Sequence, residues 1–180
     1  MSVPYIINIM SSDRVGIIAD ATTTIHRLHG NLDELTQTVL KGYFTMILLA
    51  HFPDGTKAED IQAALTGVKN LSNCLIGITP YEAPAPASNE NCEPYIVTAS
   101  GPDKEGLVSA VSEYLRLKKI NITDFTSRTD NGIYTMMLMI ALPDGTDVGK
   151  LQRSLQIAME EHHLVIGIRH QRIFSKVNDI

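Results

Sequence analysis

Cysteine is scarce in this chain of 180 residues. Its two cysteines, Cys74 and Cys92, form neither a C-x-x-C pair nor a spacing with histidine that would suit a metal ion. A pair this sparse does not make a disulfide scaffold. We therefore expect two reduced thiols and no metal site.

Long apolar runs are missing as well. No apolar stretch approaches the length of a membrane-spanning helix, which needs about 20 residues. The first residues, Met1 to Tyr5, lack the basic and apolar regions of a secretory signal peptide. The sequence therefore predicts a cytoplasmic protein that does not bind membranes.

Positive charge is in the minority, because 15 lysines and arginines stand against 20 aspartates and glutamates, which gives a formal net charge of -5. The excess lies in the first half, where 5 basic and 10 acidic residues occur up to Glu93. No overall field draws such a chain to nucleic acid. We therefore expect no direct binding to DNA or RNA.

Catalytic motifs are absent too. The sequence has no G-x-S-x-G, no P-loop and no G-x-G-x-x-G. His26 and His29 share a predicted helix face, but no carboxylate or cysteine stands near them at ligand spacing. No nucleophile, base and orienting group can be assembled, so the sequence predicts a protein without catalytic residues or a cofactor.

What the chain does contain is an internal repeat with an offset of 90 residues and no insertion. The matching pairs include Tyr5 and Tyr95, Asp13 and Asp103, Gly16 and Gly106, Asn31 and Asn121, and Gly77 and Gly167. Matches at turns, helix starts and strand centres indicate duplication of one structural unit. Between the copies, residues 82–93 read EAPAPASNENCE, a composition typical of an extended linker. We expect domains at 1–81 and 94–180.

Each copy has the order strand, helix, strand, strand, helix, strand. In the first copy the strands are expected at 5–10, 32–40, 43–52 and 75–78, with helices at 15–29 and from 56. In the second copy, Asn131 and Gly132 are a strong hairpin signal because both tolerate positive φ. This α+β order predicts two ferredoxin-like modules, each a four-stranded antiparallel sheet with both helices on one face.

The first turn between strand and helix, residues 11–17 and again 101–107, is the most informative segment. A helix N-terminus presents unpaired backbone N–H groups and partial positive charge, which suit a carboxylate. The alternative is that Asp13 and Asp103 simply cap their helices.

Asn31 and Asn121 stand at the start of the second strand of each copy. An asparagine there can both donate and accept hydrogen bonds, which matches the ammonium and carboxylate of an amino acid. The alternative is an asparagine tolerated at a turn.

The D-x-x-G turn together with the downstream Asn resembles the ACT domain, a module of many amino-acid-regulated proteins, across both copies. The resemblance implies an amino-acid ligand at an interface between modules, touched by the first turn and by the Asn. Carried over by position, the contacts are Asp13, Arg14, Gly16, Asn31, Asp103, Lys104, Gly106 and Asn121. The proline that often precedes the turn's glycine is Val15 in one copy and Glu105 in the other. The negative charge of Glu105 favours the first copy.

The resemblance implies a regulatory protein that responds to a small amino acid, with glycine and serine as candidates. Its effect would pass through a protein partner such as a DNA-binding regulator, since no helix-turn-helix or basic stripe is found. The alternative is a ligand-free interaction scaffold that docks partners on exposed strand edges.

Self-association is expected from the strand at 43–52. Tyr43, Thr45, Ile47, Leu49 and His51 alternate with Phe44, Met46, Leu48, Ala50 and Phe52. Both faces of this strand are therefore largely apolar, although the helices can cover only one of them. An apolar surface of this kind marks an interface, so we expect modules to pack through sheets and the protein to be a homo-oligomer.

Overall fold

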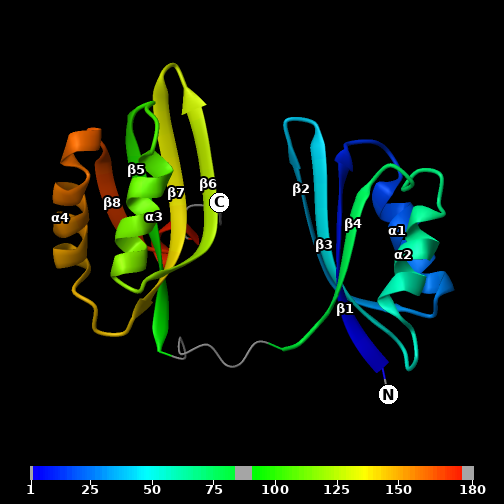
Figure 1. Ribbon diagram of the computed structural model, residues 1–180. Coiled ribbons are helices and arrows are strands. Elements are labelled where there is room, and N and C mark those ends of the chain that lie inside the picture. The colour runs from blue at the N-terminus through cyan, green and yellow to red at the C-terminus, as the bar shows by residue number, and fades with distance from the viewer. Residues whose placement is uncertain (1, 84–90, 176–180) are drawn as a thin grey trace. The chain divides into compact units, whose positions relative to one another are not determined.

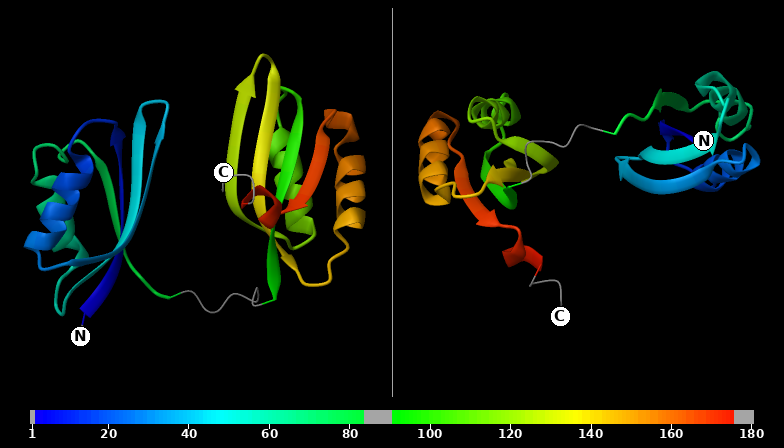
Figure 2. Two further views of the ribbon diagram at one scale, coloured as in Figure 1. Left: turned by 180° about the vertical axis from the view of Figure 1, so that it is seen from behind. Right: turned by 90° about the horizontal axis from the view of Figure 1, so that it is seen from below.

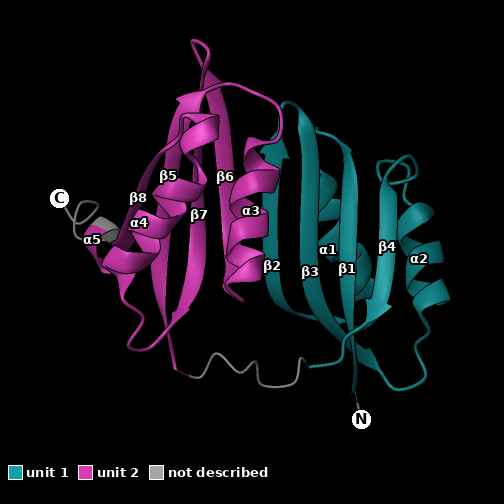
Figure 3. Ribbon diagram, turned by 60° about the vertical axis from the view of Figure 1, so that its left-hand side comes forward, with its two compact units in different colours: residues 1–84 teal, residues 85–180 magenta. Residues whose placement is uncertain are grey.

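A computed structural model describes residues 2–83 and 91–175, and the chain forms two compact units, Met1–Pro84 and Ala85–Ile180 (Figures 1 and 3). The two units are called unit 1 and unit 2 below. Residues 84–90 of the expected linker lie outside the described residues. Cys92 and Glu93, placed in the linker by composition, instead belong to a strand, because they pair with Pro143 and Leu142.

Unit 1 contains β1 (Ser2–Ser12), α1 (Ile17–Arg27), β2 (Asn31–Leu40), β3 (Tyr43–Pro53), α2 (Ala58–Thr66) and β4 (Leu75–Pro80). The four strands form one antiparallel sheet in the order β2-β3-β1-β4. Both helices lie on one face of this sheet (Figure 1). The predicted βαββαβ fold is confirmed for the first copy.

Unit 2 repeats this order with β5 (Cys92–Pro102), α3 (Leu107–Leu117), β6 (Asn121–Asp130), β7 (Ile133–Pro143), α4 (Val148–Ala158), a 3-10 turn (Glu160–His162) and β8 (Val165–His170). A short helix, α5 (Arg172–Ser175), follows. The sheet order is β6-β7-β5-β8, and Figure 2 shows the same layering in two further views. None of the helices described is long and apolar enough to cross a membrane.

Each unit has its own apolar core between sheet and helices. In unit 1 the buried side chains of β3 are Phe44, Met46, Leu48, Ala50 and Phe52, and they pack with Ile17, Ala21, Ile25, Ile61 and Leu65 from the helices. On the opposite face of β3, Tyr43 remains 61% exposed and Ile47 remains 51% exposed. One face of the sheet is therefore covered by helices and the other is open within the unit.

Two local features recur at the same place in both units. The hairpin residues Lys41 and Asn131 have φ near +48°, each followed by a glycine with positive φ, which is the geometry of a tight hairpin that matches strand twist. A β-bulge interrupts β2 between Leu32 and Glu34, and β6 is interrupted between Ile122 and Asp124. The duplication thus extends to irregularities that the strand pattern did not predict.

Candidate ligand-binding site

The first turn of unit 1 leaves the start of α1 uncapped by side chains. The Asp13 N–H donates to Gly42 O at 2.8 Å, which fixes the turn against the β2–β3 hairpin. Gly16 occupies the N-cap position with φ 98°, and no side chain accepts a hydrogen bond from the first N–H groups of the described helix. Gly106 plays the same part before α3, with φ 84°. Asp13 and Asp103 therefore do not cap these helices.

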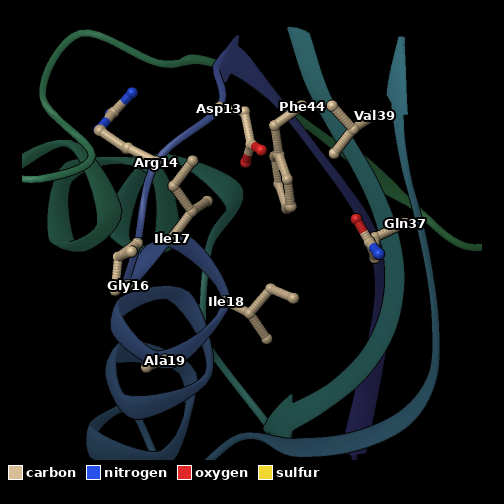
Figure 4. A pocket seen from close by; sticks show the side chains of 10 residues that line it. Asp13, Arg14, Gly16, Ile17, Ile18, Ala19, Gln37, Val39 and Phe44 are labelled. Carbon is tan, nitrogen blue, oxygen red and sulfur yellow. The ribbon is translucent and has the colours of Figure 1, made fainter. Parts of the chain in front are cut away.

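A pocket of about 620 Å³ opens beside this turn, between the N-terminus of α1 and strands β2 and β3 (Figure 4). It is lined by Asp13, Arg14, Val15, Gly16, Ile17, Ile18, Ala19, Gln37, Val39 and Phe44. Phe44 and Ile17 are buried, whereas Ile18 is 40% exposed and Val39 is 46% exposed. The volume lies within the range of about 300 to 1,000 Å³ that is usual for small-molecule sites.

Two polar side chains face this apolar hollow, Asp13 from the turn and Gln37 from β2 (Figure 4). Asp13 is exposed, and within residues 2–83 and 91–175 its carboxylate has no hydrogen-bond or ion-pair partner. Sequence reasoning had identified Asp13 but missed Gln37, Val39 and Phe44. These three lie some twenty to thirty positions further along the chain, and only the sheet register brings them to the turn.

Arg14 makes different contacts from those expected of a ligand-binding cation. Its Nε donates to Asn70 Oδ1 at 2.9 Å, and its Nη1 donates to Ser12 O at 2.9 Å and to Ser11 Oγ at 3.2 Å. Its Nη2 donates to Asn70 O and lies 3.2 Å from Cys74 Sγ. The guanidinium is thus directed to the loop between α2 and β4 and away from the pocket (Figure 4).

Asn70 completes this contact between loop and turn. Its Nδ2 donates to Asp20 Oδ2 at 2.8 Å and to Val15 O at 3.3 Å. A Cβ atom at Gly16 would lie 3.1 Å from the same Nδ2. We call Arg14, Asn70, Asp20 and Cys74 the loop network. The corresponding residues of the second copy are Lys104, Glu160, Ala110 and Leu164. All four residues of the loop network are therefore different in unit 2, which cannot form the same set of contacts.

The first turn of unit 2 is arranged differently. The Asp103 N–H donates to Gly132 O at 2.9 Å, as in unit 1. The Asp103 carboxylate, however, accepts a hydrogen bond from Thr129 Oγ1 at 3.2 Å. Lys104 and Glu105 are exposed. The carboxylate of this turn is therefore already engaged.

Asn31 and Asn121 are not brought to the first turns of their own units. Asn31 pairs with His51, which in turn pairs with Pro4 near the start of β1, whereas Asp13 follows the end of that strand. The ten residues of β2 span the distance between these two levels, which is roughly 30 Å. Asn31 Nδ2 instead lies 3.4 Å from Asp33 Oδ1, and Asn121 pairs with Ala141 at the matching end of unit 2.

The described residues offer no candidate site for a metal ion. Among the described residues, no group of three or more His, Cys, Asp or Glu side chains is placed to hold a metal ion. The pocket therefore offers a carboxylate, an amide, helix N–H groups and apolar surface, which is a set suited to binding a small zwitterion.

Solved structures of similar fold span nearly the whole chain. An "Unknown Protein" from Galdieria sulphuraria superposes with a TM-score of 0.76 at 24% identity, covering 94% of this chain and 99% of that one. A "putative glycine cleavage system transcriptional repressor" superposes with a TM-score of 0.68 at 12% identity, with the same coverage. The fold is that of two ACT modules in tandem, as the sequence resemblance implied.

No family model matches the sequence. UPF0237 proteins from Methanosarcina mazei and Methanosarcina acetivorans are each 45% identical to this chain over 49 residues. The matched segment is 27% of this chain, and it spans about half (53%) of the length of each relative. A UPF0237 protein from Corynebacterium diphtheriae is 38% identical over 86 residues, which is 97% of that relative and 47% of this chain. The match has about the length of one unit, and the chain belongs to the UPF0237 family.

Proposed function

We propose that this protein is a regulator and not an enzyme, and that an α-amino acid binds in the pocket of unit 1. The observation that carries the proposal is the position of the Asp13 carboxylate, without a partner among the described residues, at the mouth of a pocket beside an uncapped helix N-terminus. An amino acid supplies the opposite charges for both features.

The fit follows from the two ends of the ligand. Its ammonium would pair with Asp13, and its carboxylate would accept hydrogen bonds from the backbone N–H groups that follow Gly16. Arg14 contributes by holding the turn through Asn70 and not by touching the ligand. Asn31 and Asn121 are left out of this site, since they lie at the far ends of their sheets. Asp103, Lys104 and Gly106 form a second candidate site whose carboxylate is engaged by Thr129.

Regulation requires a partner that distinguishes the ligand-bound from the free protein. A ligand can shift such an equilibrium only by its difference in affinity for the two states. The fold similarity to the glycine cleavage repressor supports control of transcription. The net charge of -5 argues against direct contact with DNA, so we propose that the protein acts in the cytoplasm through a DNA-binding protein partner.

Titration calorimetry of the full chain with the common amino acids tests this proposal. We expect saturable binding of at least one amino acid below millimolar concentration, and loss of that binding in Asp13→Asn. Glycine and serine belong in the set as the smallest candidates. Absence of binding by every amino acid at millimolar concentration would overturn the sensor function.

An interaction scaffold is the second candidate, and the exposed edge of unit 1 favours it. Nine of the ten residues of β2 are exposed, and among them the last, Leu40, is 72% exposed. Such an edge can pair with another chain or carry a docked partner strand. We also propose that the protein self-associates through this edge or the open face of the sheet, and sedimentation at micromolar concentration tests this. A partner whose binding is the same with and without any amino acid would favour the scaffold over the sensor.

A further inference from the structure

The two first turns differ in whether their aspartate is free to bind a ligand. Asp103 accepts from Thr129 Oγ1 at 3.2 Å. The residue at the matching position of unit 1 is Val39, whose methyl groups cannot donate a hydrogen bond. Asp13 has no such partner among the residues described. Of the two first turns, as far as the described residues extend, the one in unit 1 therefore presents an open carboxylate together with an apolar wall.

The other residues that line the pocket of unit 1 also differ from their counterparts in unit 2. In unit 1 the pocket is bounded by Ile18, Val39 and Phe44, with Gln37 as the polar side chain on β2 (Figure 4). The matching residues of unit 2 are Val108, Thr129, Tyr134 and Ser127. Three of the four thus carry a hydroxyl group in unit 2. At these matching positions unit 1 is therefore mainly apolar, whereas unit 2 mainly carries hydroxyl groups.

A ligand held by its charged ends at Asp13 and the start of α1 places its side chain against Ile18, Val39 and Phe44. Glycine would leave the partly exposed side chains of Ile18 and Val39 in contact with water. A charged side chain would lose hydration there without gaining a partner. An aliphatic side chain removes apolar area from water on both surfaces. The volume of about 620 Å³ leaves room for a branched side chain.

We propose that unit 1 is the sensing module and that its pocket selects an α-amino acid with a branched aliphatic side chain, such as valine, leucine or isoleucine. This inference rests on the proposed function, since it names the ligand class of the same site. Unit 2 does not bind this ligand, because its aspartate is engaged and its wall is polar.

Calorimetry of the full chain with L-valine, L-leucine, glycine and L-serine tests the ligand class. We expect one ligand per chain and an affinity for valine or leucine at least about tenfold above that for glycine, because two or more additional carbons are buried. Equal or tighter binding of glycine or serine would overturn the ligand class while leaving the sensor function standing. Failure of every amino acid to bind would overturn the sensor function itself.

A pair of reciprocal substitutions tests which unit binds. Val39→Thr introduces the unit 2 residue with almost no change of volume at a half-exposed position, and we expect it to weaken valine binding by about tenfold. Thr129→Val makes the reverse change in unit 2 and should leave valine affinity unchanged. If Val39→Thr binds valine normally while Asp13→Asn does not, the turn binds the ligand but the aliphatic wall does not select it. If Thr129→Val alters the affinity instead, unit 2 is the sensing module.

Discussion

The guanidinium Nε of Arg14 lies 2.9 Å from Asn70 Oδ1, although the two residues are 56 positions apart. Asn70 also donates to Asp20 on α1. The loop between α2 and β4 therefore holds both the first turn and the start of the helix that follows it. Asn70 thus stabilises the first turn without lining the pocket.

Replacing Arg14 by the lysine of the second copy should destabilise unit 1 without removing its ligand site. Arg14→Lys loses the two hydrogen bonds that reach Asn70, so we expect the free energy of unfolding to fall by about 1 to 3 kcal/mol. Amino-acid affinity should change by less than about threefold, since the side chain points away from the pocket. Urea unfolding and calorimetry measure the two quantities. Lys104→Arg is the matched control and should not stabilise unit 2. If Arg14→Lys instead lost ligand binding while its stability stayed unchanged, Arg14 would be shown to contact the ligand.

Neutralising Asp13 should reduce ligand affinity and leave stability unchanged, which is the opposite of what we expect for Arg14→Lys. Asp13→Asn keeps the shape of an exposed side chain, so stability should stay within about 0.5 kcal/mol of the parent protein. Ligand affinity should fall at least about tenfold, because the ammonium loses its charged partner. Asp103→Asn, the same change in unit 2, should leave the affinity as it was. An equal effect of both substitutions would mean that the units share the function.

The glycine before β2 should not tolerate a side chain. A Cβ atom at Gly30 would lie 2.7 Å from both Ile25 Cγ2 and Phe52 Cε1, so Gly30→Ala should cost about 1 to 3 kcal/mol of stability through overpacking. Gly149→Ala, on α4, meets its nearest neighbours at 3.5 Å and should instead stabilise by about 0.4 to 1 kcal/mol.

Thermal and urea unfolding measure the stability of Gly30→Ala and Gly149→Ala relative to the parent protein. The second copy has Ile120 at the position of Gly30 and Leu142 at the position of Phe52. The side chains of Ile25 and Phe52 together explain why glycine is needed in unit 1. A Gly30→Ala protein as stable as the parent would show that these neighbours move aside at little cost.

The ion pair on α3 should give unit 2 a small acid-sensitive contribution. Arg116 Nε donates to Glu113 Oε2 at 2.7 Å, and this hydrogen bond lowers the pKa of the Glu113 carboxyl. A pKa lowered on folding stabilises the protein above the pKa of the unfolded glutamate, and this stabilisation is lost as the pH falls through the folded pKa. Glu113→Gln should therefore be less stable than the parent at pH 7, and the difference should disappear once the pH falls below the lowered pKa of Glu113. A difference that does not change with pH would contradict the assignment.

The sequence could predict the fold because the repeat places the same turn and strand signals twice. The hairpin at Asn131 and Gly132 was predicted from local chemistry and has the positive φ values expected. The bulge beside Asp33 carries no comparable local signal. Strand and helix order are thus determined largely by short-range patterns in this chain.

The site was less accessible to sequence reasoning because its parts come from distant segments. Arg14 was predicted to face a ligand, but its direction is decided by Asn70 in another loop. Asn31 was grouped with Asp13 although the parallel course of β1 and β2 separates them by the length of a strand. Comparing the two copies position by position would have shown Val39 against Thr129, a difference that leaves Asp13 without the hydrogen bond that Asp103 accepts.

An amide-resolved NMR titration of the full chain with L-valine tests the central claim most directly. If unit 1 binds the amino acid beside its first turn, the amide signals of Gly16, Ile17 and Ile18 should shift on saturation, together with that of Val39. The signals of Gly106, Leu107 and Val108 should not move. Shifts confined to unit 2, or no shift in either first turn at millimolar valine, would contradict the account.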